Sequence, residues 1–437
     1  RHIVEQPART VLSGPAAGVL GAVSVAVQTG FKDIVSLDMG GTSADISVVK
    51  NSRLLTTTDG KLLSYPFRFP MVDVSAIGAG GGSIAWVDSV GSLHVGPESA
   101  GADPGPCCYG RGGTEPTVTD ASVVLGYLNP SYFAAGTLSL DVNAAHRAVE
   151  RIGEPLGLSV PEAAWAIHAI VNAKMADEIR LWTVCRGYDP RDFALVLLGG
   201  AGPVNGGMLA KSLSISTLLV PITPGVLSAF GLLVANIEHD NSASFKMSED
   251  QVTAETLRRV YEDLDRRGLE SMEKDRVPAE EVRVTRSADM RYLGQSYELN
   301  VLLEEEVGGE TAGRLVRDFH SKHHQVYGQS STEAPVEFVN LRTVHWYPLQ
   351  KPEVPRPKGG GGWADAQKES RRAYFFPDHA EGVEVPVYDR ARLPVDLEQK
   401  GPLVIEQRDT TTVVYPDQSC RMDRAGNIIL KNTLERR

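Results

Sequence analysis

A buried-strand pattern that ends at a glycine bend and continues into a helix constrains the fold more than any other feature. Residues 192–221 read DFALVLLGGAGPVNGGMLAKSLSISTLLVP, which is an apolar strand, a glycine-rich turn, a helix and another apolar strand. This alternation is typical of α/β proteins with a largely parallel sheet. Because the chain has 437 residues, we expect two or three domains around this core.

A second glycine bend lies between two apolar runs in SLDMGGTSADISVV, residues 36–49, and predicts a hairpin. Its two glycines leave main-chain N–H groups unshielded, and successive N–H groups form an anion-binding nest. Thr42 can donate a hydrogen bond to a phosphate oxygen. Asp38 and Asp45 would repel a phosphate unless a cation lies between them, and Mg²⁺ binds carboxylates together with phosphate oxygens. The stretch predicts a metal–phosphate hairpin or, alternatively, a glycine-rich hairpin with capping aspartates.

The bend at residues 199–203 places bare main chain at a helix N-terminus, where anions and nucleotide sugars bind. It is not a Walker A loop, because no Gly-Lys-Ser/Thr follows, and its spacing differs from that of a dinucleotide fingerprint. Together with the bend at 38–42 it predicts two walls of one phosphate site. The pair resembles the nucleotide cleft of the actin and sugar kinase superfamily.

Composition narrows the class of protein. The formal net charge of -11 argues against a nucleic-acid platform. Four scattered cysteines are too few for a disulfide framework, so a reducing cytoplasm is the simplest setting. No run approaches the roughly 18 consecutive apolar residues that a membrane span needs, and we expect no signal peptide.

Segments that occur in a fixed order make the chain similar to the hydantoinase A / 5-oxoprolinase family, which also contains subunits of ATP-dependent acetone and acetophenone carboxylases. These segments are SGPAAGVLGA, LDMGGTSADIS, IGAGGGSIAWVD, VGPESAGADPGPCCYGRGGTEPTVTDASVVLG, RGYDPRDFALVLLGGAGP, TPGVLSAFGLL and DMRYLGQSYEL. The resemblance covers nearly all of residues 8–430, and the Gly/Pro-rich stretch at 78–120 is its most specific part. Family members carry an amino-terminal lobe with its own DxGGTxTD motif. Since this sequence has one such motif, it resembles the carboxy-terminal portion of a family member without the first lobe.

The resemblance implies an α/β fold with an actin-like ATPase (ribonuclease H-like) domain and a small, mainly β carboxy-terminal domain. The expected boundaries are a nucleotide-binding lobe at 1–245 with a loop at 78–120, an α+β domain at 246–350, a linker at 351–370 and a β-rich domain at 371–437.

The implied activity is ATP-dependent opening of a cyclic amide, such as a hydantoin or 5-oxoproline, through phosphorylation of the substrate oxygen. Alternatives are a subunit of an ATP-dependent ketone carboxylase and a non-catalytic scaffold subunit. The implied cofactors are ATP and Mg²⁺ or Mn²⁺. The implied partner is a hydantoinase B-type subunit or domain, in an oligomer, and we expect residues 1–437 to hydrolyse ATP poorly by themselves.

Site residues follow from the resemblance by position. The residues implied to meet the phosphates and the metal are Asp38, Gly40, Gly41, Thr42 and Asp45. Of these, Asp38, Thr42 and Asp45 are the catalytic candidates. Those implied to flank the nucleoside are Gly199, Gly200, Gly202 and Pro203, and Ser13 and Gly14 open a helix near the cleft, with Ser13 as its N-cap.

Two positions depart from the family pattern. The family often has histidine after GGAGPV, where this chain has Asn205, and asparagine cannot shuttle protons. Cys108 occupies the position of the family's usual cysteine, but Cys107 precedes it where alanine is common. A buried packing thiol is the preferred interpretation of Cys108, and a nucleophile that needs a base partner is the alternative.

Other polar residues have two possible roles. His168 lies near an apolar helical stripe and is expected to pack in the core. The histidines at residues 320–324 include an i, i+4 pair that could bind a metal, although a solvated helix face is the preferred interpretation. Asp120 is expected to cap the helix that follows it rather than to take part in catalysis.

Overall fold

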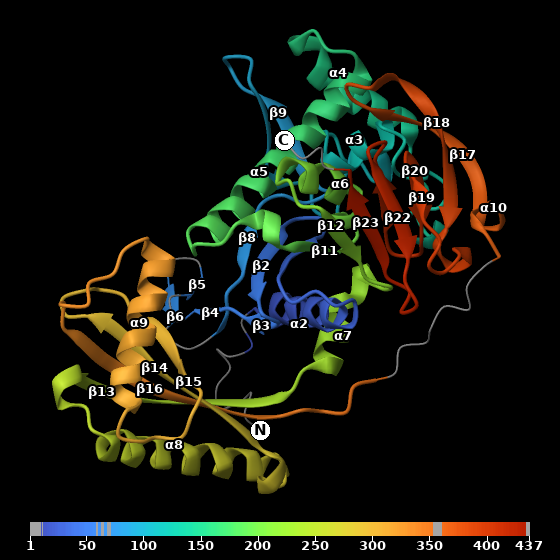
Figure 1. Cartoon of the computed structure of the whole chain (residues 1–437). Coiled ribbons are helices and arrows are strands. Elements are labelled where there is room, and N and C mark those ends of the chain that lie inside the picture. Colours follow the sequence, from blue (N-terminus) through green and yellow to red (C-terminus); the bar gives the residue numbers. More distant parts are fainter. Residues whose placement is uncertain are drawn as a thin grey trace. The chain divides into compact units, whose positions relative to one another are not determined.

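The computed structural model describes residues 10, 12–57, 60–62, 65–67, 71–352 and 361–433 (Figure 1). The chain divides into two compact units. The first contains Arg1–Thr183, Asp189–Leu233 and Pro352–Arg437, and the second contains Val184–Tyr188 and Val234–Lys351.

A mixed central sheet organises the first unit, with strand order β19-β22-β23-β12-β11-β1-β2-β3 and with β8 paired to β2. β1 is parallel to β11 and β11 to β12, whereas the other pairs are antiparallel. The strands are β1 (Ile34–Met39), β2 (Ala44–Lys50), β3 (Arg53–Leu54), β8 (Ser75–Ile77), β11 (Ala194–Leu198), β12 (Thr217–Val220), β19 (Gln399–Lys400), β22 (Gln418–Met422) and β23 (Ile428–Asn432).

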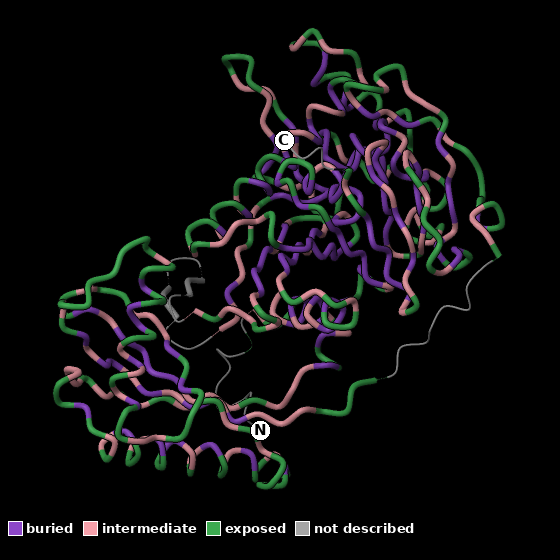
Figure 2. Tube along the Cα trace, viewed as in Figure 1, coloured by how far each residue is buried: buried purple, intermediate pink, exposed green. Residues whose placement is uncertain are grey.

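The parallel centre of this sheet explains the continuous apolar runs in the sequence. All residues of β11 and β12 are buried, as expected for strands that are covered on both faces (Figure 2). Residues of helix α2 (Ser13–Gln28) share a core cluster with Val196 and Leu198 on one face. Helix α6 (Gly202–Ser212) lies against the other face, where a Cβ at Gly206 would meet the Leu197 side chain.

The remaining α-helices in the described part of this unit are α3 (Val118–Val124), α4 (Val142–Leu156), α5 (Val160–Val184), α7 (Leu227–Val234) and α10 (Trp363–Ala366). The expectation that Ser13 caps α2 is wrong. The N-cap residue is Leu12, which adopts a left-handed conformation with φ of 61°, and no side chain of the described residues caps the helix. The sequence of residues 9–30 predicts a strand, a Ser-Gly-Pro turn and a helix, and part of that strand lies outside the described residues.

The region at 78–120 contains the hairpin of β9 (Ser83–Val87) and β10 (Leu93–Ser99) and the short 3₁₀ helix η2 (Cys107–Tyr109). Two further short pairs precede it: β4 (Thr56–Thr57) with β7 (Met71–Val72), and β5 (Gly60–Leu62) with β6 (Tyr65–Phe67).

The mainly β carboxy-terminal region belongs to the first unit rather than forming a unit of its own as the 371–437 boundary implied. Its strands β17 (Gln367–Phe375), β18 (His379–Asp389), β20 (Leu403–Glu406) and β21 (Thr411–Val414) form a separate sheet in that order. β23, however, pairs with β12, so the last strands extend the central sheet, as their position beside β12 in Figure 1 shows. Part of the predicted linker at 351–370 lies outside the described residues, and its end forms α10 and the start of β17.

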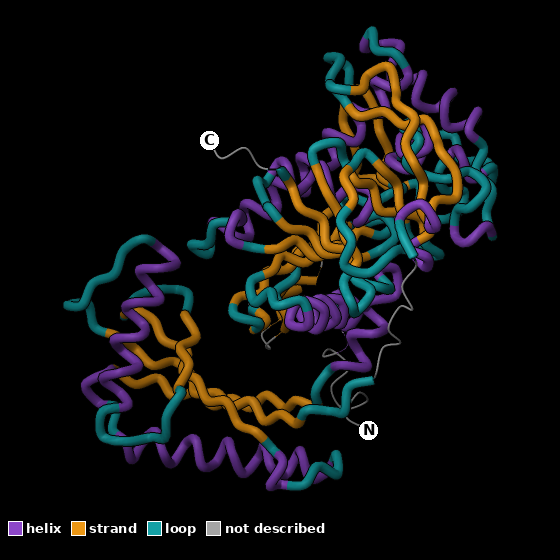
Figure 3. Tube along the Cα trace, turned by 45° about the vertical axis from the view of Figure 1, so that its right-hand side comes forward, coloured by secondary structure: helices purple, strands orange, loops and turns teal. Residues whose placement is uncertain are grey.

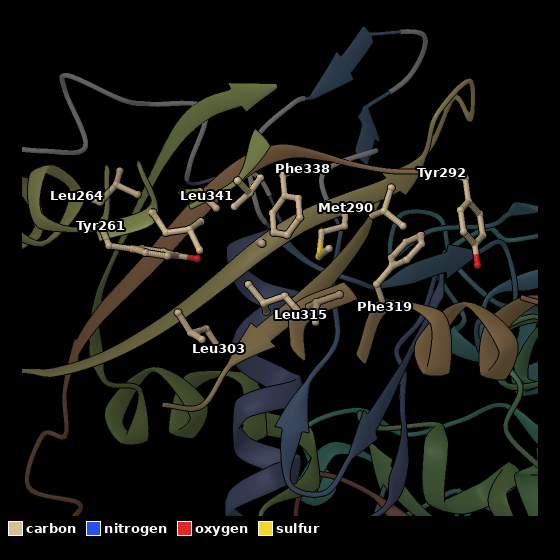
Figure 4. Close-up of a cluster of buried hydrophobic side chains, with 14 residues drawn as sticks. Tyr261, Leu264, Met290, Tyr292, Leu303, Leu315, Phe319, Phe338 and Leu341 are labelled. Atoms are coloured by element: carbon tan, nitrogen blue, oxygen red, sulfur yellow. The ribbon is translucent and has the colours of Figure 1, made fainter. Parts of the chain in front are cut away.

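The second unit is α+β, with an antiparallel sheet of order β13-β16-β14-β15 (Figure 3). Its elements are β13 (Ile237–Ser248), α8 (Ala254–Lys274), β14 (Arg283–Tyr292), β15 (Leu299–Leu303), α9 (Thr311–Tyr327) and β16 (Val336–Tyr347). Figure 4 shows side chains from both helices and three strands meeting in one core, including Tyr261, Met290, Phe319 and Phe338. Among the described residues, no helix is both long and apolar enough to cross a membrane.

Candidate functional site

The hairpin of β1 and β2 carries the first glycine bend. The two strands pair in antiparallel register with Asp38 opposite Asp45, and the Gly40 N–H closes the bend on the Ser43 carbonyl at 3.1 Å. Within the described part of the chain, the N–H groups of Gly41 and Thr42 have no hydrogen-bond partner, and the bend is open to solvent at Gly41. A Cβ added at Gly41 would meet no atom within 4 Å. The bend therefore presents bare main chain to solvent, as an anion nest requires.

A run of three glycines, residues 80–82, packs against this bend and binds its carbonyl groups. Gly81 donates its N–H to the Gly40 carbonyl at 2.9 Å, and Gly82 donates to the Gly41 carbonyl at 2.6 Å. A Cβ at Gly80 would lie 2.6 Å from the Gly41 carbonyl carbon, so the approach requires glycine. This role was missed from the sequence, although the GAGGGS run was its visible signal.

The second bend lies directly beside the first. β11 runs parallel to β1 with Leu198 opposite Asp38, and the Ala201 N–H donates to the Met39 carbonyl at 3.0 Å. Gly199 has φ of 74°, and a Cβ there would lie 2.3 Å from the same carbonyl oxygen. The structure thus brings together the two bends that the sequence predicted as neighbours.

The two aspartates share one face of the sheet, because residues opposite each other on paired strands project to the same side. Ser228, at the start of α7, donates to the Asp38 carboxylate at 3.2 Å. Burial raises the pKa of Asp38, and the bond from Ser228 partly offsets that rise. Burial, followed by the charge of Asp38, raises the pKa of Asp45 to about 6. Two partly buried carboxylates therefore repel each other at this edge.

A pair of carboxylates fits Mg²⁺, which typically takes one or two carboxylates and completes its shell with water and phosphate oxygens. In the described ranges, no group of three or more His, Cys, Asp or Glu side chains could hold a metal by itself. The donor set at Asp38 and Asp45 thus suits a metal that arrives with a polyphosphate better than a protein-enclosed metal.

A cavity of about 1130 Å³ opens at the two bends. Gly40, Gly41, Gly200 and Ala201 form part of its wall, and the rest comes mainly from α3, the segment at 128–134, the turn at 222–226 and the segment at 406–411. The other predicted site residues do not line it. These are Ser13 and Gly14 at the exposed start of α2, the hairpin residues Asp38, Thr42 and Asp45, and Gly199, Gly202 and Pro203 at the start of α6.

Asn205 lies in the cavity wall and is almost fully buried. Its amide donates to the Ala201 carbonyl at 2.9 Å, and its side-chain oxygen accepts from Asn172 at 3.0 Å. Asn172 in turn donates to the His168 carbonyl at 2.8 Å. Asn205 therefore holds the second bend to α5, a structural role that needs no proton transfer.

His168 packs in the core, as predicted. It is fully buried, its Nε2 lies 2.8 Å from the Ser122 hydroxyl, and its ring meets Tyr127 edge to face. Burial lowers the pKa of His168 to about 4, so the ring is neutral near pH 7.

Cys108 and Asp120 also have structural roles. Cys108 is fully buried, and burial together with the charge of Asp120 raises the pKa of its thiol, which disfavours the reactive thiolate. Asp120 forms a capping box with Thr117 at the start of α3 and accepts the N–H of Cys108 at 2.7 Å. Asp120 is therefore not the cap of a helix that begins after it, as predicted: Thr117 is the N-cap residue, and Asp120 lies inside α3 and completes the capping box.

In the second unit, the expected solvated histidine face is wrong for two of the three histidines. His320 and His323 are buried: Nδ1 of His320 lies 2.8 Å from the Tyr292 hydroxyl, and Nε2 of His323 lies 2.9 Å from the Gln295 amide. His324 is exposed.

Comparisons with known proteins agree with this architecture. The sequence profile of the hydantoinase/oxoprolinase family matches residues 1–241, and that of the hydantoinase/oxoprolinase C-terminal domain matches residues 244–433. The alpha subunit of caprolactamase from Pseudomonas jessenii is 36% identical over 424 residues, which cover 96% of this chain and 61% of that subunit. The gamma subunit of acetophenone carboxylase from Aromatoleum aromaticum is 32% identical over 447 residues, which cover 98% of this chain and 60% of that subunit.

Solved structures give the same result. The crystal structure of ATP-dependent caprolactamase from Pseudomonas jessenii matches with a TM-score of 0.89 and 36% identity, covering 96% of this chain and 62% of that chain. The nucleotide-free structure of acetone carboxylase matches with a TM-score of 0.76 and 28% identity, covering 98% of this chain and 62% of that one. The chain therefore spans about three fifths of the length of these relatives. Because the matches include both structural units, this chain belongs to the hydantoinase/oxoprolinase family.

Proposed function

We propose that this chain forms the ATP-binding part of an enzyme that opens a cyclic amide of the hydantoin or 5-oxoproline type. The observation that carries the proposal is the pair of glycine bends, which lie side by side at one cavity and beside two carboxylates. The 36% identity to a relative named ATP-dependent caprolactamase supports both the nucleotide and the cyclic-amide class of substrate.

The polyphosphate binds at the first bend. The N–H groups of Gly41 and Thr42 point to no protein acceptor among the described residues, and the Thr42 hydroxyl adds a third donor. These donors are fixed before the ligand arrives, because residues 80–82 hold the carbonyls on the other side of the bend. Fixed donors stabilise developing negative charge without reorganising, which is the largest contribution in many phosphoryl-transfer sites.

Asp38 and Asp45 are the residues that would hold Mg²⁺ when the polyphosphate is bound. When bound, the ion neutralises polyphosphate charge and relieves the repulsion between the two carboxylates. Ser228 keeps the Asp38 carboxylate oriented by donating its hydroxyl hydrogen.

The reaction transfers the γ-phosphoryl group of ATP to the substrate. The carbonyl oxygen of the amide attacks the γ-phosphorus, the bond from that phosphorus to the bridging oxygen of ADP breaks, and the amide nitrogen loses its proton to give an O-phosphorylated tautomer. Water then adds to the activated carbon, and the carbon–nitrogen bond of the ring breaks to leave an acyl phosphate. A second water hydrolyses the acyl phosphate to the carboxylate and inorganic phosphate. The net change is hydrolysis of one amide bond and of one ATP.

A ketone carboxylase subunit is the second candidate. It is favoured by the 32% identity to the acetophenone carboxylase gamma subunit. Phosphorylation of an enol or of bicarbonate would use the same bends. In either case we propose that a second subunit or domain of the hydantoinase B type completes the reaction, since the relatives are named as subunits.

The test is ADP release by the purified protein with its copurifying partners, measured with and without Mg²⁺ against lactams, hydantoins and ketones. We expect one cyclic amide to stimulate ADP release, with one amide bond opened for each ADP released. Stimulation by a ketone with bicarbonate would favour the carboxylase, and Mg²⁺-independent or absent nucleotide binding would refute both.

A further inference from the structure

The carboxy-terminal segment at residues 406–411 contributes to the cavity wall, although it lies about two hundred positions from the second bend in the sequence. We propose that this segment forms the nucleoside subsite, with Arg408 stacked on the base and with Asp409 and Thr410 as positioning residues. This inference rests on the proposed nucleotide function and adds the carboxy-terminal segment to the nucleoside side of the site, where the second bend is also expected.

Thr410 fixes the second bend. Its side chain is buried, and its hydroxyl donates to the Gly200 carbonyl at 2.8 Å. A Cβ at Gly200 would lie 3.4 Å from the Asp409 carbonyl oxygen, so the main chains of the two segments are almost in contact. A ligand that lies against Gly200 therefore also meets the carboxy-terminal segment.

Asp409 fixes the turn at 222–226. Its carboxylate accepts the Gly225 N–H at 2.8 Å and the Gln407 amide at 2.6 Å. A Cβ at Gly225 would lie 2.8 Å from the Cβ of Asp409, so this approach also requires glycine. The turn at 222–226 leads directly into α7, whose Ser228 binds Asp38. The segment at 225–228 thus donates hydrogen bonds both to Asp409 in the carboxy-terminal segment and to the Asp38 carboxylate.

Arg408 and Val226 are the sequence neighbours of Asp409 and Gly225, and both can contact a ligand in the cavity. Arg408 is exposed, lines the cavity and forms no ion pair or side-chain hydrogen bond within the described part of the chain. The nearby Glu406 does not pair with the Arg408 guanidinium, because Lys368 and Arg371 already bind the Glu406 carboxylate. Val226 also lines the cavity with 54% of its surface exposed.

An unpaired guanidinium plane and an exposed aliphatic side chain are complementary to the two faces of a flat heteroaromatic ring. Arginine stacks on such rings more readily than lysine, because its charge is planar, delocalised and weakly hydrated. Stacking of one base is worth enough to change affinity by about tenfold or more. The subsite therefore suits a purine base, while the first bend takes the phosphates.

The experiment separates base from phosphate by calorimetric titration with Mg-ATP and with Mg-tripolyphosphate, which lacks a nucleoside. We expect Arg408→Ala to lower the affinity for ATP about tenfold and the affinity for tripolyphosphate less than about twofold. Arg408→Lys should recover little, because it restores the charge but not the plane. The matched control is Arg424→Ala, which removes an 87% exposed arginine paired with Asp396 outside the cavity wall and should change neither ligand.

Thr410→Val tests the positioning role. It removes one hydroxyl at nearly constant volume, and we expect it to weaken the binding of ATP several-fold and to leave the affinity for tripolyphosphate unchanged. The thermal midpoint should fall slightly, because the Gly200 carbonyl loses its donor. Equal weakening of both ligands by Arg408→Ala would make Arg408 a phosphate contact and overturn the base assignment, as would unchanged ATP affinity. Failure of the unaltered protein to bind either ligand would instead refute the proposed function itself.

Discussion

The two glycine bends have similar sequences but opposite surroundings. Around Gly41 the main chain is exposed and a side chain would meet nothing, whereas around Gly199 the main chain is enclosed and a side chain would collide with the Met39 carbonyl. Carboxylates lie beside the first bend, and the hydroxyl of Thr410 contacts the second. Glycine therefore serves ligand access at one bend and close packing at the other.

The largest expected effect comes from the carboxylate side of the first bend. Asp38→Ala should lower Mg²⁺-dependent ATP hydrolysis by the complete enzyme about a hundredfold or more, because the metal and the polyphosphate charge lose their main protein ligand. Steady-state ADP release measures this, with far-UV circular dichroism as the control for folding. Turnover within a fewfold of the unaltered enzyme would remove Asp38 from the site.

Alanine at each glycine tests the contrast itself. Gly199→Ala should lower the free energy of unfolding by about 2–4 kcal/mol, because φ is 74° and the new Cβ would lie 2.3 Å from a carbonyl oxygen. Gly41→Ala should change stability by less than about 0.5 kcal/mol but weaken Mg-ATP, since its Cβ would enter the space where the phosphates bind. Urea unfolding and calorimetric titration of both variants measure the two quantities. Similar losses of stability in both would contradict the assignment of different roles.

A smaller effect concerns charge at the first bend. The pKa of Asp45 is raised to about 6, so ionising this carboxyl group costs more in the folded than in the unfolded state. The protonated group therefore contributes to the free energy of unfolding at low pH, and this contribution is lost as pH rises through about 6. Asp45→Asn should therefore stabilise the metal-free protein at pH 8 by about 1 kcal/mol, after discounting for partial exposure, and by almost nothing at pH 4. Thermal unfolding at the two pH values measures the difference. A variant that is less stable at pH 8 would show that the carboxylates do not repel each other.

The smallest effect is expected at Cys108. Cys108→Ser should keep most of the activity of the complete enzyme, because the thiol is fully buried and its raised pKa disfavours the thiolate. Complete loss of turnover with unchanged thermal stability would favour a nucleophile instead.

Local patterns in the sequence were sufficient for much of the site. The apolar runs of β1 and β11 and the glycines that follow them predicted a largely parallel sheet with both bends at one site, and the structure pairs these two strands in parallel. The burial of His168 followed from the apolar helical stripe beside it, and that of Cys108 from the tendency of free cysteines to pack in the core.

Long-range contacts could not be predicted in the same way. The support of the first bend by residues 80–82 and the contact of Thr410 with Gly200 depend on how distant segments meet, which no local period encodes. The same limit explains why β23 was assigned to a separate domain although it pairs with β12. His320 and His323 were assigned to a solvated face, since charged neighbours on α9 masked the stripe that packs against β14.

The most direct measurement is the affinity of the purified protein for Mg-tripolyphosphate in competition with Mg-ATP. If the bare main chain at Gly41 and Thr42, with the metal held at Asp38 and Asp45, binds the phosphates, tripolyphosphate should displace ATP completely, and removing Mg²⁺ should weaken both ligands strongly. Binding of ATP that tripolyphosphate cannot displace, or that does not depend on Mg²⁺, would contradict this arrangement.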